Sequence, residues 1–338
     1  MCTGIIVHTD NGVAVPARTM EFGFDVRSKI LVIPKGTPLH FLSSQPDKHG
    51  YHVESAKYGF AGMNGVEKKA VFDGVNEAGL YFGLFYFAGF AVYDTLTDTN
   101  QSTAISSEEM GNYLLSSFAT VDEVIAGLQK VTVVGSFIKD INGEAPVHYA
   151  VTDKSGKSIV IEYSKNGLQI FDNKHGVVCN NPTYDWHLTN LRNYVNLTPH
   201  NVTGFSAHGV EITPLAEGSG MLGLPGDYTS PSRFVRAAAF VQTMLPSKNE
   251  EEGVFRAFHC LNAFDIPKGA IRAKHDDQVF TDYTIWTSVV DTTNLIYYFK
   301  TYENHSPQKV DLREVLKKVN GKITTFETKS LQGYESIH

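Results

Sequence analysis

The 338-residue sequence has few cysteines and lacks several motifs that mark common classes of enzyme. Its cysteines, Cys2, Cys179 and Cys260, are an odd number without a Cys-x-x-Cys pair, which argues against a disulfide framework and against a thiolate zinc site. The patterns Gly-x-Ser-x-Gly and His-Glu-x-x-His do not occur, so the sequence predicts neither a serine hydrolase elbow nor a zinc protease helix. We expect no metal ion and no cofactor.

Long apolar runs and clusters of positive charge are also scarce. The longest apolar stretch, residues 79–93, is shorter than the roughly 20 residues that a membrane helix needs. The N-terminus has no basic region followed by an apolar signal core. The formal net charge is −7, with Lys and Arg scattered along the chain, which argues against nucleic-acid binding. We therefore expect a cytoplasmic protein without a membrane or nucleic-acid partner.

Two short motifs suggest ligand sites that their surroundings argue against. Residues 218–223 match the Gly-x-Gly-x-x-Gly pattern, but Leu224-Pro225-Gly226 follows where the helix of a dinucleotide site should begin. His49 and His52 have side chains that bind zinc, but no third ligand is spaced to join them. We predict no nucleotide site and interpret both histidines as surface residues, although the glycine-rich loop still allows close approach of backbone to a ligand.

Most of the chain alternates β-branched or aromatic runs with turns, which is typical of antiparallel sheets. Strands are expected at 29–33, 81–87, 148–152, 158–163, 177–179, 283–290 and 295–300, a strand, turn and strand over 71–80, and a polar surface loop at 38–50. Helices are expected at 106–130, where Ser106 and Glu109 have capping-box spacing, and at 231–244, led by Ser230. No Pro/Gly/Ser linker divides the chain, so we predict one α+β domain over residues 2–338.

The N-terminus is the part of the sequence with the clearest chemistry. Cys2 follows Met1 directly, and removal of Met1 would leave Cys2 with a free α-amine. A thiol with an ordinary pKa of about 8.5 and an amine near 7.7–8.0 would then place a nucleophile and a base on one residue. Asn11-Gly12 between two apolar runs predicts a hairpin that returns Arg18 toward Cys2, where a guanidinium favours the thiolate. Taken alone, Cys2 is also consistent with a cysteine at a frayed terminus.

Two further segments leave alternatives open. Asn180 follows a predicted strand and precedes Asn181-Pro182, so its amide is placed either to donate to a developing oxyanion or to form an Asx turn. Arg233 and Arg236 lie in the predicted helix at 231–244, where arginines are ordinarily solvated charges.

Together these segments resemble the choloylglycine hydrolase family of N-terminal nucleophile hydrolases, which includes bile salt hydrolases and penicillin V acylases. The similarity extends over nearly the whole chain: Met1-Cys2, 17–20, 73–77, 180–190, 223–228, 232–234 and 281–284. The resemblance implies an αββα four-layer sandwich of antiparallel sheets. It also implies an amidohydrolase whose N-terminal cysteine attacks a linear amide and forms an acyl-enzyme. Water then hydrolyses this acyl-enzyme.

Site residues are carried over by motif from the family. Cys2 resembles the nucleophile and Arg18 its charged neighbour. Asn180 resembles the side-chain oxyanion donor, helped by the backbone N–H of Tyr86, and Arg233 resembles a second active-site arginine.

The chain departs from the family at Glu21, where an aspartate usually holds the α-amine. The extra methylene is expected to affect the rate rather than the mechanism. Arg18-Thr19-Met20 and Tyr86, where many bile salt hydrolases carry Asn, favour the penicillin V acylase branch, with a bile salt hydrolase as the second prediction. The residues expected to line the acyl pocket are Met20, Phe22, Phe24, Phe60, Tyr86 and Phe137, although aromatic side chains are by default counted as core.

The resemblance further implies a homotetramer that acts on a small-molecule amide. A more distant alternative is a non-catalytic binding protein on the same fold, which would require Met1 to remain on Cys2.

Overall fold

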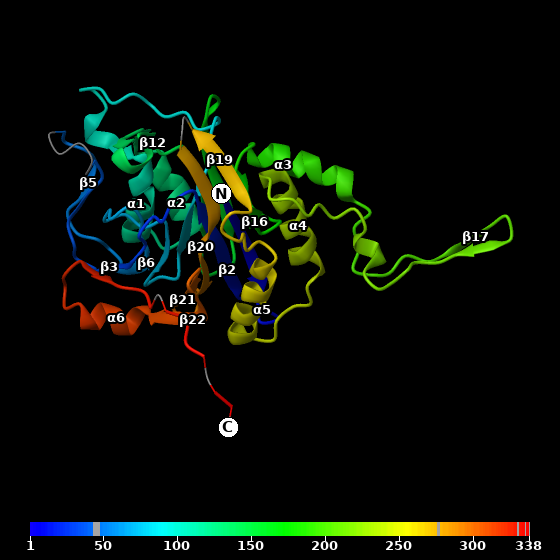
Figure 1. Ribbon diagram of the computed structural model, residues 1–338. Coiled ribbons are helices and arrows are strands. Elements are labelled where there is room, and N and C mark those ends of the chain that lie inside the picture. The colour runs from blue at the N-terminus through cyan, green and yellow to red at the C-terminus, as the bar shows by residue number, and fades with distance from the viewer. Residues whose placement is uncertain (43–47, 276–277, 330, 335, 338) are drawn as a thin grey trace.

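Two antiparallel sheets lie face to face at the centre of the protein (Figure 1). The structure is a computed structural model and describes residues 1–42, 48–275, 278–329, 331–334 and 336–337. Within these residues the first sheet has the order β16 (Val177–Val178), β1 (Cys2–His8), β2 (Ala14–Phe22), β20 (Gln278–Asp291), β21 (Ile296–Thr301) and β22 (Asn304–Asp311), with β19 (Ile271–His275) paired to β20. The second has the order β15 (Gly167–Asp172), β14 (Ser158–Ser164), β13 (Val147–Thr152), β8 (Tyr81–Tyr86), β7 (Asp73–Asn76), β6 (Phe60–Met63), β3 (Ile30–Ile33) and β23 (Thr324–Phe326).

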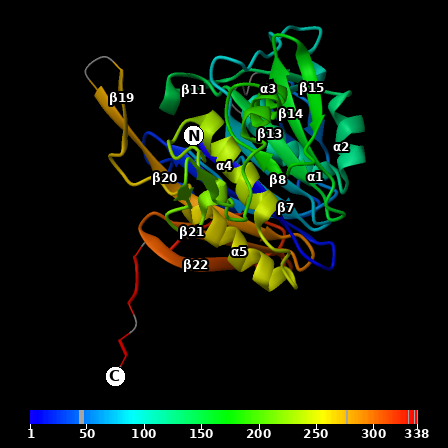
Figure 2. The same ribbon diagram turned by 90° about the vertical axis from the view of Figure 1, so that its right-hand side faces the viewer.

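Helices cover the outer face of each sheet (Figure 2). The second sheet is covered by α1 (Met110–Ser117), which contacts β7 and β8, and by α2 (Val121–Leu128). The first sheet is covered by α4 (Ser230–Thr243), against β1 and β16, and by α5 (Glu250–Asn262), against β1 and β2. The short helix α3 (Tyr184–Leu191) packs on α4, and α6 (Leu312–Lys318) lies against β3 and β6. The predicted four-layer sandwich is therefore confirmed.

Alternation along β8 shows why the core has two parts. Tyr81 and Phe85 belong to the hydrophobic cluster that includes the strands of the first sheet, whereas Phe82 and Leu84 belong to the cluster under α1 and α2. Successive strand residues point to opposite faces of a sheet. Because both faces of these strands are covered, their sequences are apolar almost throughout.

The helix expected at 106–130 is interrupted. A 3₁₀ turn at Ser107–Glu109 precedes α1, which ends at Ser117, and α2 starts only at Val121. The N-cap of α2 is Thr120, whose Oγ1 accepts from the Glu123 N–H at 3.2 Å, while Glu123 Oε2 accepts from the N–H of the preceding Ala119 at 2.7 Å. The predicted box at Ser106 and Glu109 is therefore wrong, because the matching spacing at 120–123 is the one that starts a helix.

The helix predicted at 231–244 is confirmed as α4, with Pro231 in its first turn. The helices α3, α5 and α6 were not predicted. A signal for α5 was present, since Asn249 precedes three glutamates and its side chain accepts from the Glu252 N–H at 2.9 Å.

The polar loop expected at 38–50 is described only in part, because residues 43–47 lie outside the described chain. Its ends pair as β4 (Leu39–His40) and β5 (His52–Val53). His52 stacks on His40 with ring centroids 5.7 Å apart, and His49 is exposed. Among the described residues no helix is both long and apolar enough to span a membrane.

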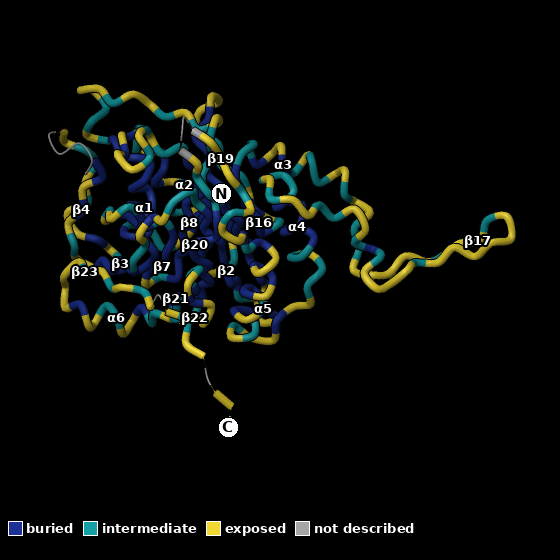
Figure 3. The backbone as a smooth tube through the Cα atoms, viewed as in Figure 1, coloured by how far each residue is buried: buried dark blue, intermediate teal, exposed yellow. Residues whose placement is uncertain are grey.

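A long arm between α3 and α4 leaves the body of the protein (Figures 1 and 3). Its tip is the hairpin of β17 (Phe205–Ala207) and β18 (Val210–Ile212), and the tube in Figure 3 is largely exposed along it. The glycine-rich segment 218–223 lies on the returning part of this arm and opens no α-helix there.

Candidate active site

Cys2 lies at the start of β1, between β16 and β2 in the first sheet, and its side chain is buried. The predicted hairpin is present: β1 pairs with β2 so that Cys2 faces Met20 and Gly4 faces Arg18. This register brings the Arg18 side chain back to the cysteine, with Nη2 at 2.9 Å from Sγ. Gly4 is needed next to this contact because a Cβ there would meet Phe85 at 2.8 Å.

Arg18 is completely buried and held from several directions. Its Nη1 donates to the carbonyl oxygens of Phe72 and Leu84, and its guanidinium lies 4.4 Å from the centre of the Phe85 ring. Burial opposes the charge, but Cys2 and Asp73 nearby raise the pKa of Arg18 above its ordinary value. A charged guanidinium is therefore fixed beside the sulfur.

Asn180 connects three elements at this end of β1. Its Oδ1 accepts from the Cys2 backbone N–H at 2.8 Å and from Arg233 Nη2 at 2.7 Å, while its Nδ2 donates to the Tyr86 carbonyl at 2.7 Å. Arg233 also donates from Nη1 to the Cys2 carbonyl and to Thr3 Oγ1. The side chain of Asn180 is thus committed to other elements, and its interpretation as an Asx turn is wrong.

The loop that carries Asn180 is anchored by buried polar groups. His148 Nε2 lies 2.9 Å from the Cys179 carbonyl, and His187 Nε2 lies 2.9 Å from the Asn180 carbonyl. The Asn180 N–H donates to Ser230 Oγ at 3.0 Å. Burial lowers the pKa of His187 to about 4, so its ring is neutral near pH 7 and donates through Nε2.

The two arginines of α4 are buried, so their interpretation as solvated charges is wrong. Arg233 is fully buried at the Asn180 junction and Arg236 is 6% exposed. Arg236 donates from Nη1 to the carbonyls of Pro225 and Asp227 and so fixes the 223–228 segment before α4.

Glu21 lies next to Cys2 with one carboxylate oxygen unsatisfied. Its side chain is 1% exposed, Oε1 accepts from Thr284 Oγ1 at 3.0 Å, and Oε2 has no partner among the described residues. Burial raises the pKa of Glu21, while the N-terminal charge and Arg233 lower it. Met1 pairs with the Glu21 backbone, since its N-terminal nitrogen donates to the Glu21 carbonyl at 2.6 Å. With Met1 present, the Cys2 nitrogen is an amide rather than an amine.

The backbone N–H of Tyr86 points away from β13. Hydrogen-bonded and non-hydrogen-bonded pairs alternate in an antiparallel ladder. The Phe87 N–H donates to Pro146, so the neighbouring pair of Tyr86 with Val147 is the non-hydrogen-bonded type. Both backbone groups of Tyr86 therefore face the side on which its carbonyl meets Asn180.

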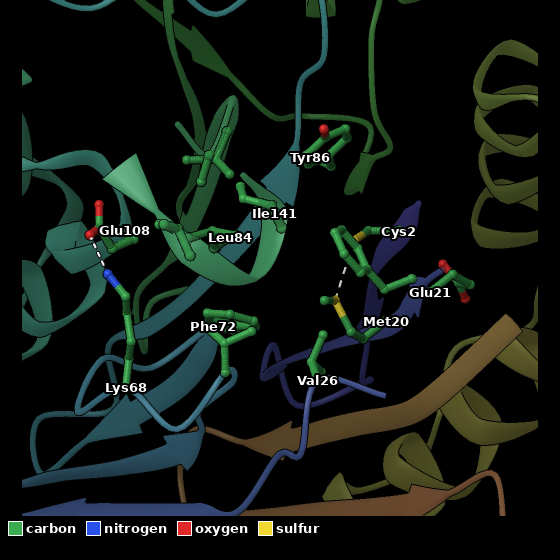
Figure 4. A pocket seen from close by; sticks show the side chains of 15 residues that line it. Cys2, Met20, Glu21, Val26, Lys68, Phe72, Leu84, Tyr86, Glu108 and Ile141 are labelled. Atoms are coloured by element: carbon green, nitrogen blue, oxygen red, sulfur yellow. Dashed lines mark hydrogen bonds and ion pairs between the residues drawn. The ribbon is translucent and has the colours of Figure 1, made fainter. Parts of the chain in front are cut away.

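A cavity opens beside the Cys2 sulfur (Figure 4). It is lined by Cys2, Met20, Glu21, Phe22, Val26, Val66, Lys68, Phe72, Leu84, Tyr86, Glu108, Ile138, Ile141, Ala145 and Val147. The ring of Tyr86 contacts that of Phe22 edge to face at 6.0 Å. Of the six residues expected here, Met20, Phe22 and Tyr86 are in the lining.

The other three residues expected here lie outside this lining. Phe60 is fully buried in the core under α1, Phe137 is 61% exposed, and Phe24 contacts Phe22 edge to face. Most of the lining that was missed comes from loops around 66–72 and 138–145. Sequence periodicity gives no signal for loop residues that meet only in the folded protein.

Comparison with known proteins places this site in a family. Residues 2–324 match the family model described as linear amide C-N hydrolases, choloylglycine hydrolase family. The chain belongs to the choloylglycine hydrolase family. It is therefore a linear amide C–N hydrolase with its nucleophilic cysteine at the N-terminus, and the non-catalytic alternative is not supported.

Relatives within the choloylglycine hydrolase family cover most of the chain. A bile salt hydrolase/transferase of Lactiplantibacillus plantarum is 34% identical over 92% of both chains. A crystal structure of a conjugated bile acid hydrolase from Clostridium perfringens superposes with a TM-score of 0.87 at 28% identity, covering all of both chains. A penicillin V acylase of Pectobacterium atrosepticum is 26% identical over 89% of this chain and 77% of that protein. These similarities favour the bile salt hydrolases over the penicillin V acylase branch that Tyr86 and the Arg18-Thr19-Met20 segment suggested.

Proposed function

We propose that this choloylglycine hydrolase family member hydrolyses the amide between a bile acid and glycine or taurine, in preference to the amide of penicillin V. The proposal rests on the 34% identity to a bile salt hydrolase/transferase over nine-tenths of both chains. The cavity beside Cys2 supports it, because its walls are mainly aliphatic and aromatic and so suit an apolar acyl group.

We propose that Met1 is removed in the mature enzyme. The freed Cys2 amine would then lie beside Asn180 Oδ1, which accepts from the same nitrogen at 2.8 Å. The amine takes the thiol proton as Sγ attacks the carbonyl carbon, and passes it to the leaving amine when the C–N bond breaks. Arg18 Nη2, 2.9 Å from Sγ, places a positive charge beside the sulfur from which the proton is removed. Water then hydrolyses the acyl-enzyme, with the same amine as base.

The negative charge on the carbonyl oxygen is proposed to be met by Asn180 and Tyr86. An asparagine amide has two N–H donors, and Asn180 uses one of them for the Tyr86 carbonyl. The second Asn180 N–H is free to donate to the oxyanion. The Tyr86 N–H can donate to it as well, because it makes no hydrogen bond to β13. Arg233 holds Asn180 in place through Oδ1.

The substrate assignment is tested by kcat/KM for glycocholate, taurocholate and penicillin V, with a Cys2→Ala variant as the blank. We expect both conjugates to be cleaved with higher kcat/KM than penicillin V, by about 10-fold or more, the scale of discrimination that pocket shape provides. A higher value for penicillin V would overturn the assignment and support the acylase branch.

We also propose that the protein is a homotetramer in which the arm carrying β17 and β18 packs against other copies. Apolar side chains are exposed along it, among them Phe205 at 61% and Val210 at 60%. Exposed apolar groups gathered on one projecting segment are typical of an interface. Light scattering should give about four times the chain mass of 37.3 kDa, and Phe205→Ser with Val210→Ser should lower it. A monomeric wild type would contradict the proposal.

A further inference from the structure

A buried carboxylate holds both ends of the segment that carries Asn180. The side chain of Glu162, on β14, is fully buried. Its Oε1 accepts from the N–H of Tyr184, the first residue of α3, at 2.9 Å, and lies 3.2 Å from Nδ1 of His148 on the paired strand β13. His148 Nε2 in turn lies 2.9 Å from the Cys179 carbonyl oxygen. Glu162 therefore holds Tyr184 directly and Cys179 through His148, and Asn180 lies between these two contacts.

The contacts of His148 fix where its protons lie. A carbonyl oxygen only accepts hydrogen bonds, so Nε2 donates to Cys179. With a hydrogen on Nε2, the ring makes a hydrogen bond to Glu162 only if a further proton lies between Nδ1 and Oε1. The pair of His148 and Glu162 is therefore neutral overall, whichever partner keeps the shared proton, and both of its contacts to the Asn180 segment depend on that proton.

Aromatic neighbours hold the His148 ring in one orientation. Phe87 stacks on it with ring centroids 4.4 Å apart and planes at 6°, and Phe85 meets it edge to face at 6.0 Å. Among the described residues, the lining of the active-site cavity includes neither His148 nor Glu162. A substrate in that cavity would not touch the pair.

We propose that Glu162 and His148 are positioning residues for amide hydrolysis, which fix the 179–184 segment so that the free N–H of Asn180 meets the developing oxyanion. The proposal rests on the proposed oxyanion role of Asn180. Arg233 holds the Asn180 side chain through Oδ1 at 2.7 Å, and the pair fixes the backbone on which that side chain stands. Misplacing a catalytic group by about 1 Å can lower the rate by about 10²-fold, so loss of the pair should lower kcat and leave KM nearly unchanged.

Glu162→Gln tests the pair with almost no change in shape. An amide oxygen in the place of Oε1 can accept from Tyr184 and from Nδ1, but a neutral His148 then has no hydrogen on Nε2 for the Cys179 carbonyl. An amide nitrogen in that place loses the bond from Tyr184. One contact of the segment therefore fails in either orientation of the amide.

The assay of Glu162→Gln uses the amide that the wild type cleaves with the highest kcat/KM, so it does not depend on the bile salt assignment. We expect kcat to fall by about 10-fold or more and KM to stay within about twofold. Alkylation of Cys2 by iodoacetamide should keep its wild-type rate, because that reaction forms no tetrahedral oxyanion. Wild-type kcat in Glu162→Gln would overturn the proposal.

Two substitutions of His148 separate its contacts and decide the question if Glu162→Gln fails to fold. The amide nitrogen of glutamine is as many bonds from Cα as Nε2, and that of asparagine is as many as Nδ1. His148→Gln can therefore still donate to the Cys179 carbonyl, whereas His148→Asn reaches only toward Glu162. We expect kcat to be lower in His148→Asn by about 10-fold, and equal values in the two variants would contradict the positioning role.

A matched control uses another buried carboxylate that holds the first residue of a helix. Asp153 is 4% exposed, and its Oδ2 accepts from the N–H of Val121, the first residue of α2, at 2.9 Å. Asp153→Asn should lower the Tm but keep the wild-type kcat. A fall in kcat as large as that of Glu162→Gln would mean that both variants only lose folded enzyme, and the proposal would fail.

Combination with Asn180→Ala separates the positioning role from the oxyanion assignment. If the pair acts through Asn180, then Asn180→Ala/Glu162→Gln should have the kcat of Asn180→Ala alone, because residues that act as a unit are not additive. A further fall in the double variant would show another route and overturn the proposal. If Asn180→Ala lowers kcat but Glu162→Gln does not, the positioning role fails and the oxyanion assignment stands. If Asn180→Ala keeps the wild-type kcat, the oxyanion assignment fails and the positioning role fails with it.

Discussion

The guanidinium of Arg18 contacts the sulfur of Cys2 directly, with Nη2 at 2.9 Å from Sγ and both side chains buried. The two residues are joined by the β1–β2 hairpin, so the contact depends on the register of two adjacent strands. Inside the protein a fixed charge at this distance acts more strongly than it would in water.

Removal of the Arg18 charge should make the sulfur less reactive. In Arg18→Met the sulfur loses its neighbouring cation, and we expect alkylation by iodoacetamide to slow by about 10-fold or more. Cys179 and Cys260 provide an internal control, since burial raises their pKa values to about 11 and about 12. Mass spectrometry should show a single adduct, at Cys2. Equal alkylation rates in wild type and variant would mean that Arg18 does not activate the thiol.

Maturation should remove Met1 from the purified protein. Intact mass is expected to be short by one methionine, because the proposed base is the α-amine that this cleavage frees. Cys2→Ala should abolish turnover, whereas Cys260→Ala should retain it, since Cys260 lies in α5 away from the cavity. Retention of Met1 in a fully active preparation would rule out the amine as the base.

Asn180 should matter for the rate of reaction more than for binding. Only the transition state carries the charge that the free Asn180 N–H is proposed to meet, so Asn180→Ala should lower kcat by about 10²- to 10³-fold. KM for the same substrate should change little. A change confined to KM would indicate that Asn180 is a binding contact instead.

Glu21 should tolerate shortening but not removal of its carboxylate. Glu21 lies beside Cys2 with Oε2 buried and without a partner among the described residues, and a freed α-amine needs a partner. Glu21→Asp should keep or raise kcat, whereas Glu21→Ala should lower it by about 10²-fold, the effect of misplacing a catalytic group by about 1 Å. Glu21→Gln keeps the length of the side chain but removes its charge, so kcat in this variant shows which of the two properties matters. Wild-type kcat in Glu21→Ala would show that the amine has another partner.

His187 should make the fold sensitive to mild acid. Its folded pKa of about 4 lies below the ordinary value of 6.5, so the unfolded chain binds a proton first. The stability that the neutral ring contributes is complete above pH 6.5 and is lost as the pH falls toward 4, by up to about 3 kcal/mol. In His187→Gln this part of the pH dependence should disappear from urea unfolding curves. Parallel curves for both proteins between pH 7 and pH 4 would contradict the assignment.

The amino-acid sequence by itself determined several local elements and pointed to Cys2 as the reactive residue. Asn11-Gly12 between apolar runs indicated the β1–β2 hairpin, because a turn depends on neighbouring residues alone. The strands β8, β13 and β14 were predicted from the sequence for the same reason. The helix α4, whose first turn contains Pro231, was predicted as well. The position of Cys2 next to Met1, together with Arg18, indicated the chemistry.

Tertiary structure alone decided which distant residues meet. Asn180, Arg233 and Tyr86 lie on three separate elements, and only the stacking of the two sheets and α4 brings their polar groups to Cys2. The cavity lining was misjudged at Phe60 and Phe137, because the side that a residue faces depends on what packs there. The pairing of Lys68 with Glu108 had no signal in the chain, since a charge run is ordinarily solvated and burial is a property of the folded protein.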